Sequence, residues 1–148
     1  MKPLETVAAL GLAVSMSCSS CGDGNGNDRV VISQIEVMSI DPNYVEDPLG
    51  EQGGPDVFAV FSVLGDAYYT SPVVEDATFP VRVDVENLSF QGIEMDREVT
   101  VTLFDHDDDS LEDFIGEVTF VPRDLTYNEP VRHSLVGGYL QVDLLLLW

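Results

Sequence analysis

Asp105, Asp107 and Asp113 stand close together in the chain, in a D-x-D-x5-D pattern between two apolar segments. Two carboxylates about 4 Å apart repel each other by roughly 4 kcal/mol at the effective dielectric of a protein surface. A bound cation would relieve this repulsion. Calcium accepts about six to eight oxygen ligands in loose geometry, whereas magnesium prefers a strict octahedron with retained waters. The pattern therefore predicts a calcium site.

An EF-hand is the first alternative for such a loop. Its turn needs a glycine in the middle and a bidentate glutamate at the end, between two helices. Ser110 and Gly116 occupy those two positions here. The preceding segment, 98–104, carries β-branched residues in period-two alternation, which is typical of a strand. The acidic loop is therefore predicted to join strands rather than helices.

The acidic loop and the Asp-Phe-Ile-Gly-Glu run that follows it at 113–117 together resemble the third calcium-binding loop of C2 domains. Residues 55–61 are similar to the Asp-Pro-Tyr-Val segment of that family. Residues 70–81 resemble its hairpin from a threonine to Asn-Pro-Val-Trp, with Phe79 for the Asn and Arg82 for the Trp. The resemblance covers residues 30–148. It implies an all-β, antiparallel, C2-like β-sandwich of about seven to eight strands.

The resemblance also implies a set of calcium ligands from two loops at one end of the sandwich. Asp105, Asp107 and Asp113 match the third loop fully. Ser110 falls where the family often supplies a further oxygen, and His106 would contribute its backbone carbonyl.

In the first loop, Asp56 matches the aspartate of the Asp-Pro-Tyr segment. Asp47 is the predicted upstream partner, with Glu51 and Glu46 as alternatives, because the loop is longer than usual. The alternative to a calcium site is an acidic, metal-free loop on a C2-like protein-interaction domain.

The rest of the chain supports one β-sandwich. About 120 to 130 residues follow the N-terminal segment, which is enough for a single core. No long helical period is visible, and the final strand is expected to be buried on both faces. Strand patterns are predicted at 30–39, 57–64, 81–90, 99–104, 115–121 and 139–147.

The N-terminal segment has the features of an export signal. Residues 7–16 form a largely apolar run, too short to span a bilayer and suited to a signal-peptide core. Cys18 follows in a context that resembles a bacterial lipobox, so residues 1–17 are predicted to be the signal peptide. Lipidation is predicted at Cys18, with residues 18–29 as the flexible tether. The alternatives are a plain secretory signal, lipidation at Cys21, or a pairing of the two cysteines.

The charge of the chain limits its partners. The formal net charge is −21, from 27 acids and six bases, which excludes nucleic acid because phosphate binding needs clustered Lys and Arg. The arginines are scattered along the sequence, and Asp108 and Asp109 stand where membrane-penetrating C2 domains carry basic or apolar tips. The partner is left open among phospholipid headgroups, a protein and an acidic glycan. The predicted role is calcium-dependent binding or structural stabilisation at a bacterial envelope surface.

An enzyme is the alternative from another class. His106, His133 and Ser134 are the residue types that a hydrolase would use, but no G-x-S-x-G turn is present. Adjacent strand residues point to opposite faces, so His133 and Ser134 would not pair. The sequence therefore predicts a protein without a catalytic site, and a calcium-dependent hydrolase remains an alternative without residue-level support.

Overall fold

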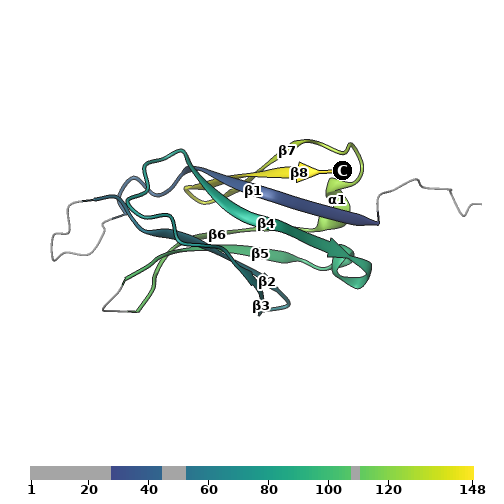
Figure 1. Ribbon diagram of the computed structural model, residues 1–148, viewed down its shortest axis with the longest axis horizontal. Helices are drawn as coiled ribbons and strands as arrows, with labels where there is room; N and C mark the ends of the chain where they lie inside the picture. Colours follow the sequence, from purple (N-terminus) through teal and green to yellow (C-terminus); the bar gives the residue numbers. More distant parts are fainter. Residues whose placement is uncertain (1–27, 45–52, 108–110) are drawn as a thin grey trace, which may run out of the picture.

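The computed structural model describes residues 28–44, 53–107 and 111–148, which form two antiparallel four-stranded sheets packed face to face (Figure 1). Regular structure other than β is limited, among these residues, to the 3-10 helix η1 (Gly92–Asp96) and the helical turn α1 (Pro122–Leu125). The strands are β1 (Arg29–Ser39), β2 (Val57–Val63), β3 (Asp66–Thr70), β4 (Val81–Gln91), β5 (Val99–Asp105), β6 (Asp113–Phe120), β7 (Arg132–Gly137) and β8 (Leu140–Leu147).

The strand order brings the two ends of the domain together. One sheet has the order β4-β1-β8-β7 and the other has the order β3-β2-β5-β6. The first and last strands therefore pair in the middle of one sheet, where Ile35 lies opposite Leu144. This order is a property of the assembled sandwich, and the hydrophobic pattern along the chain did not reveal it.

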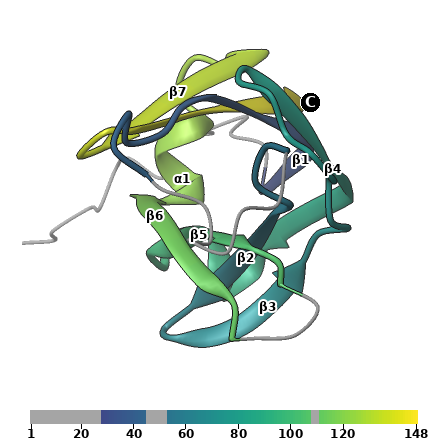
Figure 2. The same ribbon diagram turned by 90° about the vertical axis from the view of Figure 1, so that its left-hand side faces the viewer.

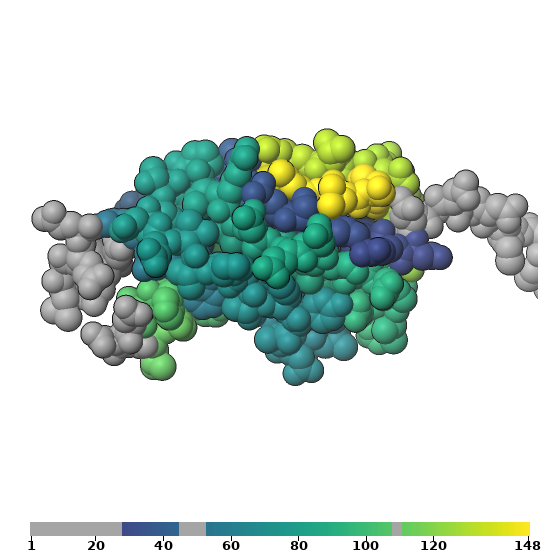
Figure 3. Space-filling view, in the orientation of Figure 1, coloured from purple at the N-terminus to yellow at the C-terminus, as the bar shows by residue number. Residues whose placement is uncertain are grey.

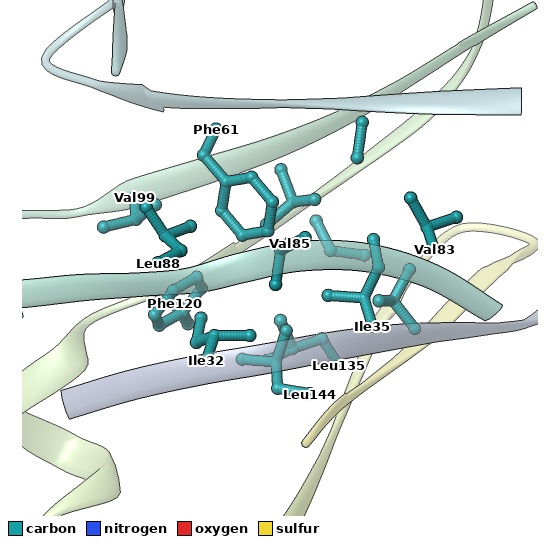
Figure 4. Packing of buried hydrophobic residues seen from close by; sticks show 14 of the residues in the cluster. Ile32, Ile35, Phe61, Val83, Val85, Leu88, Val99, Phe120, Leu135 and Leu144 are labelled. Atoms are coloured by element: carbon teal, nitrogen blue, oxygen red, sulfur yellow. The ribbon is translucent and has the colours of Figure 1, made fainter. Parts of the chain in front are cut away.

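The core lies between the sheets and follows the period-two pattern of the strands. On β4, Val81, Val83 and Val85 are buried and the residues between them are exposed. Figure 4 shows side chains from both sheets meeting in this layer, among them Phe61, Ile35 and Leu144. β4 thus has one apolar and one wet face, as is usual in an antiparallel sandwich.

All six predicted strands are present, with ends within two residues of the predicted ones. β3 and β7 were missed. Both are edge strands, and their side chains are mostly exposed, with Leu135 the one buried residue of β7. A strand with few buried side chains needs few apolar residues, so its sequence shows almost no alternation of apolar and polar residues.

The prediction that the last strand is buried on both faces is correct only for its centre. Leu144 faces the core, and Asp143 is buried on the outer face of the sheet, whereas Leu147 is 48% exposed. The Asp143 carboxylate is held by Arg132 at 3.0 Å and by the Ser134 hydroxyl, which donates at 2.6 Å. The buried charge is therefore partnered, as buried charges must be.

The sandwich has two ends with different composition. The acidic pole is the end at the left of Figure 1, where β2 and β6 begin and β5 ends. Tyr44 and Asp56 belong to it, because both contact Asp105 at the end of β5. The tether pole, at the right, contains the first residues of β1 together with η1 and α1. Arg123 of α1 joins this end by contacting Asp96 at 2.9 Å and Asp28 at 3.7 Å. Within the part of the chain that the structure describes, there is no helix with the length and apolarity to cross a membrane.

Candidate calcium site

Asp105 is the centre of the acidic pole, seen end-on in Figure 2. It is the last residue of β5 and continues the inward-facing series of Val101 and Leu103, so its side chain is only 5% exposed. One carboxylate oxygen accepts a hydrogen bond from the Tyr44 hydroxyl at 3.0 Å, and the other accepts one from the Asp56 backbone N–H at 2.7 Å. Asp105 thereby ties the end of β5 to the segment after β1 and to the start of β2.

Asp56 connects three segments of the acidic pole. Its Oδ1 accepts a hydrogen bond from the Asp76 backbone N–H at 2.7 Å, and its backbone carbonyl accepts one from the His106 N–H at 2.8 Å. The predicted first-loop ligand and the predicted third-loop ligands are therefore adjacent. Sequence analysis did not identify Asp76, because its contact is made through the backbone and any residue type other than proline would supply it.

Tyr44 is the residue that sequence analysis missed. The pKa of its hydroxyl is raised well above the ordinary tyrosine value, first by burial and then by the hydrogen bond to Asp105 and the negative charges of Asp105, Asp113 and Asp107. The charges of three predicted ligands therefore act on one hydroxyl, and Asp105 contacts it directly. The hydroxyl stays protonated and remains a donor to Asp105.

The pKa of Asp105 is also raised above the ordinary carboxyl value. Burial is the largest cause, and the charges of Asp107 and Asp56 add to it, while the hydrogen bonds from Asp56 and Tyr44 act in the opposite direction. The hydrogen bonds from the Asp56 N–H and the Tyr44 hydroxyl thus do not fully compensate the desolvation and repulsion of the ionised Asp105 carboxylate. A cation near Asp105 would lower that cost.

Asp113 and His106 complete the described part of the pole. Asp113 is exposed and is the first residue of β6. It lies directly opposite Asp105 on β5, and two like charges in such a cross-strand pair destabilise a sheet. The Nδ1 atom of His106 lies 3.1 Å and 3.2 Å from the two carboxylate oxygens of Glu112. The His106 side chain is therefore engaged by Glu112, which leaves its backbone carbonyl as its predicted contribution to a site.

Several predicted ligands fall outside the described residues. Asp47, its alternatives Glu46 and Glu51, and Ser110 belong to the two segments that lie there, as does the predicted lipidation residue Cys18 in the N-terminal segment. Within residues 28–44, 53–107 and 111–148, no three or more His, Cys, Asp or Glu side chains are arranged to hold a metal ion.

The described residues nevertheless fit calcium in the type of donor. Asp56, Asp105, Asp107 and Asp113 offer carboxylate oxygens, the ligands that hard cations prefer. Each oxygen of Asp105 accepts a hydrogen bond and has a further lone pair with which to meet a cation. The buried, incompletely compensated carboxylate is the observation that supports a cation here.

Removal of the Tyr44 hydroxyl tests the central hydrogen bond. Tyr44→Phe is expected to lower the free energy of unfolding by about 1–2 kcal/mol, because a buried carboxylate loses one of its donors. Urea denaturation in the presence of a chelator measures the change. Tyr139→Phe is the matched control, since Tyr139 is 66% exposed, and equal losses in both variants would contradict the assigned role of Tyr44.

The residues considered for catalysis are not assembled. The Ser134 hydroxyl is committed to Asp143, and His133 is its neighbour on β7 and so points to the other face of the sheet. His106 lies at the acidic pole, whereas His133 lies near the start of β7, toward the tether pole. The side chains of His106, His133 and Ser134 therefore do not form a pair of nucleophile and base.

Comparison with known proteins reveals similarity in structure but not in sequence. No protein-family model matches the chain, and no curated protein matches it closely enough to count as a relative. A structure of two C2 domains of Extended-Synaptotagmin 2 superimposes with a TM-score of 0.53 at 16% identity, covering 100% of this chain and 48% of the other. A calcium-bound structure of the same two domains gives a TM-score of 0.50 at 15% identity, covering 80% and 44%.

Human GIVD cytosolic phospholipase A2, in complex with methyl gamma-linolenyl fluorophosphonate, gives a TM-score of 0.50 at 14% identity, covering 79% of this chain. The match spans only 17% of the phospholipase chain, and this chain spans less than half of the synaptotagmin structures. At these identities the similarity concerns the fold. The two four-stranded sheets and these structural matches show that the chain has the fold of C2 domains.

Proposed function

We propose that this protein is a calcium-binding C2-like module, with Asp56, Asp105, Asp107 and Asp113 as ligands and Asp47 and Ser110 completing the set. The observation that carries the proposal is the buried Asp105 carboxylate, whose pKa is raised by burial and by neighbouring acids although two donors contact it. A calcium ion supplies the positive charge that these carboxylates lack. Its chemical effect is to neutralise the negative charge of the acidic pole.

A calorimetric titration tests the proposal directly. Chelator-treated protein is expected to bind calcium saturably and to show no comparable heat with magnesium, because a ligand set made of carboxylates without strict octahedral geometry suits the larger ion. Asp66→Asn is the control variant. It removes one negative charge from the exposed start of β3, far along the chain from the acidic loop, and is expected to bind calcium as the original protein does. Equal binding of both ions, or none, would remove calcium as the physiological ligand.

A metal-free protein-interaction domain is the second candidate, and one observation favours it. Both Asp105 oxygens have donors from the protein itself, so the buried carboxylate is partnered without a metal. In this case the acidic pole would recognise a partner by charge alone. The calcium titration separates the two candidates, because only the first requires saturable binding of the metal.

The proposed location is a bacterial envelope surface, with the domain held there by lipid on Cys18. The sequence places Asp108 and Asp109 within the acidic loop, and their charges disfavour insertion of the acidic pole into anionic lipid. The pole is therefore proposed to meet a protein or acidic-glycan ligand, or phospholipid headgroups through a bridging calcium ion. The support for this location comes from the sequence features of the N-terminal segment and the acidic loop.

Export gives a separate prediction. Cys18→Ser is expected to leave the protein without lipid and to move it from the membrane fraction to the soluble fraction, because the modified thiol is missing. Cys21→Ser is the matched control and is expected to stay with the membrane. Fractionation followed by mass spectrometry of the N-terminal peptide measures both effects, and the same distribution for the two variants would argue against Cys18.

A further inference from the structure

Exposed apolar side chains gather at the tether pole. Leu147 is 48% exposed and Trp148 is 40% exposed. The Trp148 Nε1–H donates to the Pro130 carbonyl at 3.0 Å, which places the indole beside the segment that precedes β7. Val131 in that segment is 76% exposed. These three side chains expose apolar surface side by side at one end of the domain, and adjoining exposed apolar side chains can mark an interaction site.

A shallow hollow adjoins this surface on the outer side of the β4-β1-β8-β7 sheet. It is lined by Arg29, Val31, Asn87, Leu147 and Trp148. Figure 3 shows the last residues of β8, in yellow, beside the first residues of β1, in dark purple. The hollow therefore combines an indole, aliphatic side chains and an exposed guanidinium. We call Arg29, Val31, Val131, Leu147 and Trp148 together the tether-pole patch.

The tether-pole patch surrounds the point where the N-terminal segment joins the fold. Residues 1–27 connect to the domain at Asp28, which contacts Arg123 of α1 at 3.7 Å and precedes β1 directly. The acidic pole lies at the other end of β1, a strand of 11 residues. At about 3.3 Å per residue the two poles are roughly 36 Å apart.

We propose that the tether-pole patch rests in the headgroup region of the membrane that holds the Cys18 anchor, so that the acidic pole points away from that membrane. Tryptophan favours the interface between water and hydrocarbon, and an arginine beside it can reach lipid phosphates while its stem stays in apolar surroundings. The proposal rests on the anchoring part of the proposed function and does not depend on calcium.

Charge distinguishes the two poles. The tether pole carries the carboxylates Asp28 and Asp96, but both contact Arg123, and Arg29 lines the hollow nearby. The acidic pole gathers Asp56, Asp105 and Asp113, so a membrane surface bearing anionic lipid would repel that end more strongly. The segment that precedes the domain offers no apolar side chain to cover the patch, because residues 19–27 contain no large apolar residue. A lipid surface is therefore the occupant that matches the chemistry of the patch and its position beside the tether.

Trp148 is the only tryptophan of the chain and reports on the patch without a label. The mature chain from Cys18, with Cys21→Ser, is coupled through Cys18 to a maleimide lipid in phosphatidylcholine vesicles with or without brominated acyl chains. Trp148 emission is expected to shift to shorter wavelength and to be quenched by the brominated lipid, with or without calcium. Leu147→Ser combined with Val131→Ser is expected to reduce the quenching, with circular dichroism as the check on folding.

A probe at the other end serves as the matched control. Trp148→Phe combined with Leu111→Trp moves the single tryptophan to the acidic pole, where Leu111 is 88% exposed, and its emission is expected to remain unquenched. Equal or stronger quenching at position 111 would overturn the proposed orientation. A spectral shift of Trp148 without quenching by bromine would also overturn it and would indicate that a second copy of the chain covers the patch. A failed calcium titration of the same sample would refute the calcium site and leave this result intact.

Discussion

Calcium at a hundredfold excess over its dissociation constant is expected to raise the melting temperature of this protein by on the order of 10 °C, and Asp107→Asn is expected to remove that increase. A ligand that binds only the folded state adds about 2.7 kcal/mol at this excess. For a domain of this length, 1 kcal/mol corresponds to roughly 4 °C. Asp107 is half-buried and contributes negative charge to both Tyr44 and Asp105, so its loss weakens the site without opening the core.

In the absence of calcium, Asp107→Asn is expected to be as stable as the original protein or slightly more stable, because the substitution relieves repulsion with Asp105. Scanning calorimetry with calcium, with magnesium and with a chelator measures both effects. Asp66→Asn removes one charge from β3 and should keep the full calcium-dependent increase. A calcium-dependent increase that survives Asp107→Asn would show that the ion binds elsewhere.

Asp105→Ala is expected to be the most destabilising single change at the acidic pole in the absence of metal. It removes the acceptor of the Asp56 N–H and of the Tyr44 hydroxyl. Each buried donor left without a partner costs about 1–3 kcal/mol. Urea denaturation in the presence of a chelator measures the loss.

Asp105→Asn is the matched variant, because it keeps the shape and replaces the charge. Its carbonyl oxygen can accept from the Asp56 N–H, and its amide can donate to the Tyr44 oxygen. The metal-free variant is therefore expected to be at least as stable as the original protein at neutral pH, because it avoids the cost of the ionised carboxylate, while calcium binding is lost. Equal destabilisation by Ala and Asn would show that the negative charge, rather than the hydrogen bonds, holds the pole together.

The raised pKa of Asp105 adds a pH dependence with a definite sign. In a carboxyl group whose pKa is higher in the folded state, the folded state binds the proton more tightly than the unfolded state. The contribution of Asp105 to stability is therefore fully present below the ordinary carboxyl pKa and is lost as the pH rises through the raised value. Asp105→Asn should remove this decline in the metal-free protein.

Much of the candidate site was predictable from the sequence because several of its carboxylates lie close together along the chain. Asp105, Asp107 and Asp113 lie within one loop and the strand ends beside it, so their spacing alone indicated a cation site. The C2 resemblance predicted that Asp56 lies near these three residues. In the structure its backbone N–H donates a hydrogen bond to Asp105. Tyr44 could not be found in this way, because 61 residues separate it from Asp105 and a lone tyrosine after a strand carries no pattern.

The all-β class, six of the strands and the acidic loop were predictable from local patterns, since period-two alternation and clustered carboxylates are both local properties of a chain. The strand order, the edge strands β3 and β7, the hydrogen bonds of Tyr44 and Asp56, and the separation of the acidic pole from the tether pole became visible in the folded domain. Each of these depends on which strands become neighbours. That choice is made by packing two apolar faces against each other, and the burial it produces extends over residues far apart in the sequence.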